Sequence, residues 1–280
     1  MKLHVEGITI DAISLAGFYT CIQLPDFKLA IDMGICPRSA INKQHVFFTH
    51  CHGDHIAGVI RHCSSREMLG LPPPTYYVGS EDVENFTSFM EAARKLCRSR
   101  MPFELFAIQP NQQVDVRKNL RVKSFRSIHR VPCQGYIVYG LKQKLRPEFL
   151  GMPRENLISL REGGEKLTKD VETPLISYTG DTTIDVFHRI PELQSVKVMI
   201  TEVTFFDDKV DAKAAKKRGH IHIDDIVEQI HLFNQPAVIF THFSSRYSTS
   251  MVEQICKKKL PSELCQRLHL IPNDQPLVGF

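Results

Sequence analysis

The stretch VFFTHCHGDHIAGV, residues 46–59, places three histidines and one aspartate within six positions, directly after an apolar run. The candidate ligands are His50, His52, Asp54 and His55. Function is often found where a rigid strand gives way to a loop, and imidazole and carboxylate groups bind divalent cations. Four ligands in so short a turn cannot all reach one tetrahedral ion. They therefore predict two neighbouring ions, about 3.5–4 Å apart as in two-metal hydrolases.

Three later segments repeat the same arrangement of an apolar, β-rich run followed by a candidate ligand. FRSIHRV gives His129, ISYTGDTT gives Asp181, and VIFTHFSSRY gives His242. We expect these side chains to join the site of the opening stretch. Within that stretch, a turn at Gly53 would let one short loop serve both ions. Cys51 is interpreted as non-ligating, because neighbouring side chains on an extended turn point apart.

The composition is that of a globular protein. The 280 residues are 42% hydrophobic and 24% charged, and a net charge of +4 does not by itself indicate nucleic acid. The eight cysteines are scattered without a Cys-x-x-Cys pair, which favours reduced thiols. The N-terminus lacks an apolar signal region, and no run of about 18 apolar residues occurs. We therefore expect a cytoplasmic protein that does not enter a membrane.

The pattern of elements favours an α/β fold. Short strands dominate the first half, whereas strands and helices alternate in the second half, with helices expected over 56–70, 80–97 and 221–234. Two such halves fit a four-layer αββα sandwich that spans residues 1–280 as one domain. A polar stretch with seven lysines and arginines, at about 142–172, interrupts the strands as an insertion.

Together, THCHGDHIAG, TGDTT, TEVTFFDD and HFSSRY resemble the short-form tRNase Z family of the metallo-β-lactamase fold superfamily. The similarity covers nearly the whole chain in ligand order and spacing. It implies the four-layer fold of that superfamily and an endoribonuclease that removes the 3′ trailer from precursor tRNA. It also implies a homodimer.

The resemblance also assigns the ligands. It implies one ion on His50, His52 and His129, a second ion on Asp54, His55 and His242, and Asp181 bridging both. The expected cofactors are two Zn²⁺ ions per subunit, with Mn²⁺ as a possible substitute, and Asp54 counts as a catalytic residue as well as a ligand. Metal binding lowers the pKa of water from about 15.7 toward 7, so a hydroxide nucleophile is available at neutral pH.

A proton donor for the leaving RNA oxygen is expected in KRGHIHIDDIVEQI, residues 217–230. Histidine suits this role because its pKa lies near working pH. His220 stands 22 residues before His242, the spacing found in the family, and His222 is the competing candidate. Glu202 matches a family glutamate that orients the donor.

Substrate contacts are expected in two places. Beyond His242, Ser244 and Arg246 could bind a phosphate, although Arg246 could also be structural. In the family, the insertion at 142–172 holds an arm that grips tRNA, so Lys142, Lys144 and Arg146 are candidate contacts. The alternative for this segment is a solvated hairpin.

Two further functions stay open at this point. The first is another hydrolase of the superfamily, acting on small phosphodiesters or thioesters. The second is an inactive scaffold that binds RNA or a protein partner.

Overall fold

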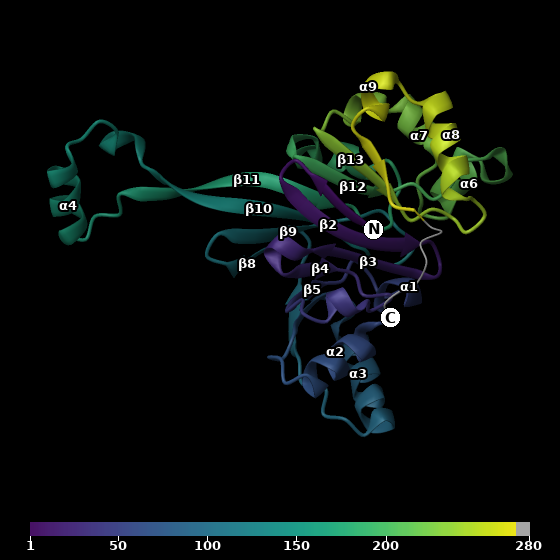
Figure 1. Ribbon diagram of the computed structural model, residues 1–280, viewed down its shortest axis with the longest axis horizontal. Coiled ribbons are helices and arrows are strands. Elements are labelled where there is room, and N and C mark those ends of the chain that lie inside the picture. Colours follow the sequence, from purple (N-terminus) through teal and green to yellow (C-terminus); the bar gives the residue numbers. More distant parts are fainter. Residues whose placement is uncertain (273–280) are drawn as a thin grey trace.

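Two seven-stranded mixed sheets form the centre of the computed structural model, which describes residues 1–272 (Figure 1). The first sheet contains, in spatial order, β1 (Lys2–Val5), β2 (Ile8–Leu15), β3 (Tyr19–Leu24), β4 (Leu29–Ile31), β5 (His45–Phe47), β6 (Thr75–Gly79) and β7 (Glu104–Ile108). The second sheet has the order β14-β13-β12-β11-β10-β9-β8, with β8 (Gln113–Arg117), β9 (Leu120–Arg126), β10 (Gln134–Leu145), β11 (Thr168–Tyr178), β12 (Val198–Glu202), β13 (Ala237–Thr241) and β14 (Leu268–Leu270).

Both sheets follow the same plan. Strands β1 to β4 pair antiparallel and β4 to β7 pair parallel, and likewise β8 to β11 are antiparallel and β11 to β14 parallel. The carboxyl ends of parallel strands meet at one edge of a sheet, where ligands commonly bind. Loops from both sheets therefore present their side chains at a shared edge.

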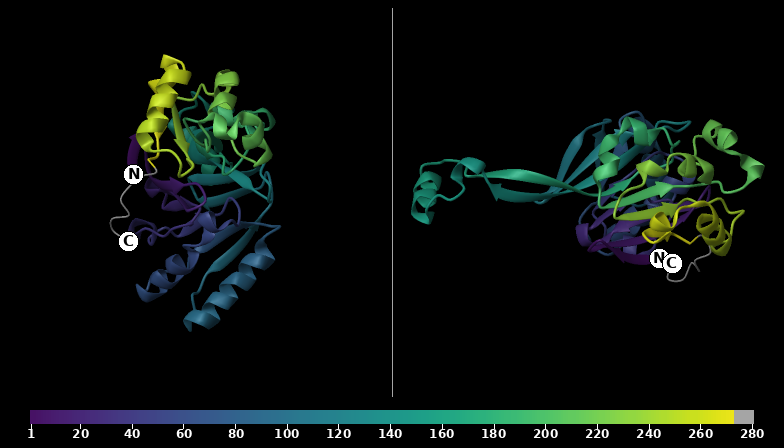
Figure 2. Two further views of the ribbon diagram at one scale, coloured as in Figure 1. Left: turned by 90° about the vertical axis from the view of Figure 1, so that its right-hand side faces the viewer. Right: turned by 90° about the horizontal axis from the view of Figure 1, so that it is seen from above.

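Helices cover the two outer faces of this pair of sheets (Figure 2). On the first sheet lie α1 (Gly53–Ile56), α2 (Val59–Met68) and α3 (Val83–Cys97), and on the side of the second lie α5 (Val186–Arg189), α6 (Ala212–Lys217), α7 (Ile223–Glu228), α8 (Thr249–Lys259) and α9 (Ser262–Cys265). None of the helices within residues 1–272 is both long and apolar enough to cross a bilayer.

Three apolar cores separate the layers. One lies between the sheets and includes Ile22, Tyr136 and Ile200. The outer two pack the helices, with Phe48 typical of the first sheet and Phe233 of the second. The resulting order, helix–sheet–sheet–helix, agrees with the sequence prediction. Burial of apolar area, at about 25 cal/mol per Å², is the main force that holds these layers together.

The predicted helix over 221–234 is shorter than expected. Helix α7 ends at Glu228, and a separate 3₁₀ turn follows over Ile230–Leu232. The apolar residues Leu232 and Phe233 are buried in the core beneath the second sheet. The apolar spacing of 221–234 is therefore satisfied by a helix and a turn rather than by one continuous helix.

The insertion at about 142–172 is a hairpin that projects from the body of the molecule (Figure 1). Strands β10 and β11 stay paired out to Leu145 and Thr168, and α4 (Arg154–Glu162) lies at the tip. Its predicted basic character is weak: seven basic side chains stand beside six acidic ones. Arg146, for example, pairs with Glu148 and Glu165, so acidic neighbours offset part of its charge.

Candidate metal centre

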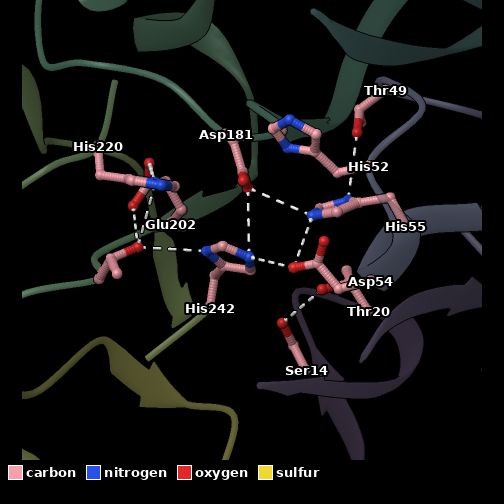
Figure 3. Close-up of polar contacts among 12 residues, drawn as sticks. Ser14, Thr20, Thr49, His52, Asp54, His55, Asp181, Glu202, His220 and His242 are labelled. Carbon is pink, nitrogen blue, oxygen red and sulfur yellow. Dashed lines mark hydrogen bonds and ion pairs between the residues drawn. The ribbon is translucent and has the colours of Figure 1, made fainter. Parts of the chain in front are cut away.

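Seven histidine and aspartate side chains meet where strands end at the edge of the two sheets. Figure 3 labels five of them, His52, Asp54, His55, Asp181 and His242. His50 follows β5, Asp181 follows β11, and His242 follows β13 directly. Asp54 and His55 lie in the one-turn helix α1, whose N-cap residue is His52. His129 comes three residues after β9, the same distance as His50 from β5 and Asp181 from β11. The structure thus brings together every ligand that the sequence predicted.

The first cluster consists of His50, His52, His129 and Asp181, and its ligand atoms all lie within 4.8 Å of one another. The Nε2 atom of His50 is 2.9 Å from Nδ1 of His52 and 3.8 Å from Oδ2 of Asp181. His50 and Asp181 are almost completely buried. These donor atoms converge from three segments of the chain, which follow β5, β9 and β11.

The second cluster consists of Asp54, His55 and His242. Nε2 of His55 and Nε2 of His242 lie 3.6 and 3.4 Å from Oδ2 of Asp54, and 3.6 and 3.5 Å from Oδ1 of Asp181. Two atoms bound to one zinc ion at about 2.1 Å lie about 3.4 Å apart at the tetrahedral angle. The second cluster therefore has the spacing of a set of metal ligands, and Asp181 presents one oxygen to each cluster.

The Nδ1 atoms of three ligand histidines are held by partners, which leaves Nε2 for a metal. His55 Nδ1 lies 2.7 Å from Asp32, His129 Nδ1 lies 2.9 Å from the carbonyl of Gly219, and His242 Nδ1 lies 3.2 Å from Thr204. Such bonds set the tautomer and the orientation of metal-binding imidazoles.

Three ligand atoms of the clusters are buried without a hydrogen-bond partner in residues 1–272. They are Nε2 of His55, Nε2 of His129 and Oδ1 of Asp181. Burying a polar atom without a partner costs about 1–3 kcal/mol in proteins. A pair of divalent ions would satisfy all three atoms, so the residues present fit two such ions.

The charges around the clusters also favour a cation. Burial opposes the charged form of His55, but the negative charges of Asp181, Asp32 and Asp54 outweigh it and raise the pKa of His55 to about 10. Burial acts to raise the pKa of Asp181, but the positive charges of His242, His55 and His50 hold it well below its usual range. The site therefore stabilises positive charge at the position where the ligand atoms converge.

Asp32 is a site residue that the sequence analysis missed. It lies just after β4, is fully buried, and accepts hydrogen bonds from the backbone nitrogen and the hydroxyl of Thr49 as well as from His55. It has a φ of 60°, and His242 has a φ of 63°, values that are uncommon outside glycine and cluster at functional sites. The apolar run FKLAID, which ends in Asp32, carries the same pattern as the predicted ligands and could have identified it.

Glycine is required in the opening stretch at Gly58, not at Gly53. A Cβ atom on Gly58 would lie 2.6 Å from the backbone carbon of Ile35, whereas a Cβ atom on Gly53 would meet nothing within 4 Å. Gly53 opens helix α1 with an ordinary backbone conformation. The chain does turn at Gly53, in the one-turn helix that carries Asp54 and His55, whereas the close packing against the 33–36 loop that needs glycine is at Gly58.

His220 and Glu202 form a pair beside the second cluster. Nδ1 of His220 donates to Oε1 of Glu202 at 2.8 Å, and that carboxylate also accepts from Thr182 and Thr204. Burial opposes the charge on His220, yet Glu202 raises the pKa of His220 to about 9. A ligand atom of His220 lies within 4.8 Å of ligand atoms of Asp181 and His242.

His222, the competing candidate, has a different role in the structure. It is the N-cap of α7, where Nδ1 accepts from the backbone nitrogen of Asp224 at 3.1 Å. Nε2 lies 3.3 Å from the carbonyl oxygen of Asp207. With both ring nitrogens engaged and only 1% of its surface exposed, His222 does not face the clusters.

The predicted substrate contacts are dispersed. Ser244 and Arg246 line a cleft that His220 also lines, and Arg246 interacts with Asp207 and Tyr247. Lys142 and Lys144 are exposed on β10, in the projecting hairpin, and Arg146 follows that strand. The structure thus separates the predicted contacts into a group beside the clusters and a group on the hairpin.

Comparison with known proteins identifies relatives of the chain by sequence and by fold. Residues 34–243 match the model of a family described as the beta-lactamase superfamily domain. The chain is 35% identical over 253 residues to tRNase Z TRZ1 of Arabidopsis thaliana, and this match covers 90% of each protein. The structure of the short form of human tRNase Z matches with a TM-score of 0.60 at 16% identity, over 95% of this chain and 97% of that one. Zn²⁺-bound PqqB of Methylobacterium extorquens matches with a TM-score of 0.62 at 14% identity, over 93% and 96%.

Proposed function

Because the chain belongs to the tRNase Z (ribonuclease Z) family of the metallo-β-lactamase superfamily, we propose that it removes the 3′ trailer from precursor tRNA by hydrolysis. The observation that carries the proposal is the convergence of the two clusters on Asp181, with the His220–Glu202 pair beside them. Two-metal sites with a separate acid are suited to in-line displacement at a phosphodiester.

The first cluster would hold one divalent ion, and the second cluster would hold another, with Asp181 between them. Nitrogen and oxygen donors at near-tetrahedral spacing favour zinc, and a fold relative is a zinc-bound protein. Mn²⁺ is an alternative with similar donors. When bound, such ions supply hydroxide at neutral pH and neutralise charge on the phosphate.

His220 is the proposed general acid. Glu202 holds Nδ1 and favours the charged form, so Nε2 carries a proton that His220 can donate to the leaving 3′-oxygen of the RNA. The engaged ring nitrogens of His222 exclude it from this step. The chain's own contribution is to hold a protonated imidazole beside the metal ligands.

The projecting hairpin is the proposed grip on tRNA outside the cleavage site. Its Lys142 and Lys144 are exposed, and lysines at this position suit a backbone recognised by shape. Because Gln143 pairs with Asp170, residues 144–169 can be replaced by an Asn-Gly turn without disturbing the rest of the ladder. We expect this deletion to raise the KM for precursor tRNA and to leave turnover of bis-p-nitrophenyl phosphate unchanged. Equal damage to both substrates would assign the hairpin to the fold instead.

Side-by-side assays of two substrates test the proposed function. Purified protein with zinc is given a precursor tRNA that carries a 3′ trailer and, separately, bis-p-nitrophenyl phosphate. We expect trailer cleavage that requires metal, with about two divalent ions bound per chain. Rapid hydrolysis of the small ester without trailer cleavage would favour another hydrolase of the superfamily. Fewer than one ion per chain, with no activity on added zinc or manganese, would favour an inactive scaffold.

A further inference from the structure

A cleft beside the metal centre contains three arginines and no carboxylate among its lining residues. It has a volume of about 560 Å³, and Arg130, Arg218 and Arg246 line it together with Phe205, His220 and Ser244. Arg130 comes from the loop after β9 and Arg218 from the end of α6, so distant parts of the chain build it. Ligand pockets typically measure about 300–1,000 Å³, which is sufficient for a nucleotide.

Phe205 holds two of the arginines in place. The guanidinium carbons of Arg218 and Arg246 lie 5.6 and 5.5 Å from the centre of its ring, within the range of a cation–π contact. The ring of His220 lies edge-on to Phe205 at 6.0 Å. Because a guanidinium that is already ordered loses less freedom on binding, this platform prepares its N–H groups for an anion beside His220.

The protein neutralises only part of the positive charge of the cleft. Arg246 has Asp207 at 3.6 Å, but Arg130 and Arg218 have no carboxylate within ion-pair distance in residues 1–272. Clustered arginines without acidic partners are suited to phosphate, which a guanidinium binds through two parallel hydrogen bonds. No asparagine or glutamine lines the cleft to read a base edge.

The position of His220 decides which part of the RNA enters the cleft. On the proposed function, His220 protonates the 3′-oxygen that leaves, so the nucleotide bearing that oxygen lies on the His220 side of the metal centre. His220 lines the cleft, so the cleft lies on this side. We propose that the cleft is the subsite for the last nucleotide retained in the product, and that Arg130 and Arg218 bind the phosphodiester on the 5′ side of that nucleotide.

This inference rests on the proposed function. An experiment that removes charge from the protein and from the RNA tests it. The protein variant is Arg130→Gln with Arg218→Gln, and the RNA variant carries a neutral methylphosphonate at the linkage 5′ to the retained nucleotide. Arg98→Gln is the matched control, because Arg98 is exposed at the far end of α3 and also lacks a carboxylate partner within residues 1–272.

We expect each change alone to raise the KM for precursor RNA by about tenfold, the usual effect of losing hydrogen bonds to a charged group, and the two together to add little more. Turnover of bis-p-nitrophenyl phosphate, which has no second phosphodiester for these arginines to bind, should fall less than turnover of precursor RNA. Arg98→Gln should behave as the unmodified protein. An unaltered KM in the protein variant Arg130→Gln with Arg218→Gln would overturn the subsite. So would increases in KM from the protein and RNA changes that multiply when the two are combined. If the unmodified protein cleaves no precursor at all, both the proposed function and the subsite fail.

Discussion

The Nδ1 atom of His220 lies 2.8 Å from Oε1 of Glu202, and the Glu202 carboxylate is completely buried. A buried carboxylate in this contact holds the imidazole in one orientation and stabilises its charged form. His222, two residues later, instead caps a helix. The geometry therefore separates the proposed acid, His220, from a structural histidine, His222, and agrees with the preference that the family spacing gives to His220.

His220→Ala should retain two bound ions but lose turnover of precursor tRNA by about 100-fold or more, the usual contribution of a general acid. His222→Ala should instead lower thermal stability, because the cap of α7 is lost, and should keep most activity per folded molecule. Metal content, melting temperature and kcat measured together check both variants. Loss of turnover in His222→Ala together with retained turnover in His220→Ala would refute the assignment.

Glu202→Gln should shift the pH profile of kcat. Burial lowers the pKa of His220, but the charge of Glu202 raises this pKa to about 9. Removing the charge of Glu202 therefore lowers the pKa of His220. A general acid acts in its protonated form, which is lost as pH rises through its pKa. The alkaline limb of the profile should therefore move to lower pH in the variant. An unmoved limb in a variant that still binds two ions would contradict the role of Glu202.

Asp32→Asn should weaken metal binding at the second cluster without removing a ligand. Asp32 orients His55 and Thr49, and asparagine tolerates its backbone φ of 60°. Loss of such a partner typically lowers metal affinity by about 10–100-fold. Zinc competition titrations measure the effect, with Asp26→Asn as the control at an exposed carboxylate. Equal zinc affinity in the two variants would show that Asp32 does not support the metal site.

Gly58→Ala should destabilise the protein by about 1–3 kcal/mol, because its Cβ would overlap the backbone of the 33–36 loop. Gly53→Ala is the matched control in the same stretch, since a Cβ there meets nothing within 4 Å and alanine favours a helix. Urea unfolding of both variants measures the difference. Comparable losses at the two positions would contradict the packing described for Gly58.

Much of the metal centre could be predicted from sequence because its ligands follow apolar strands. His50, Asp181 and His242 each stand after such a run, and sheet edges bring such positions together. The same pattern at Asp32 was present but not used. His129 also follows a strand, but its ring is held by the carbonyl of Gly219, a contact 90 residues away in the chain that local patterns do not contain.

Other features depended on tertiary structure. The choice between His220 and His222 depends on which ring contacts Glu202, and the local sequence does not specify this contact. Arg130 and Arg218 carry no periodic signal, since exposed loop arginines are common, and only the fold places them in one cleft. The weak charge of the hairpin, in contrast, could be predicted from the sequence by counting its acidic residues together with its basic ones. The homodimer, the single-domain organisation and the cytoplasmic location stay predictions.

Mapping the cleavage site on a precursor tRNA tests the central claim most directly. The substrate carries a labelled 5′ end and a 3′ trailer, and the products are sized and their ends identified. Hydrolysis with His220 as acid predicts one cut at the junction with the trailer, a 3′-hydroxyl on the tRNA and a 5′-phosphate on the trailer. Scattered cuts, a cyclic phosphate on the tRNA end, or no cut by a protein that holds two ions would contradict the account.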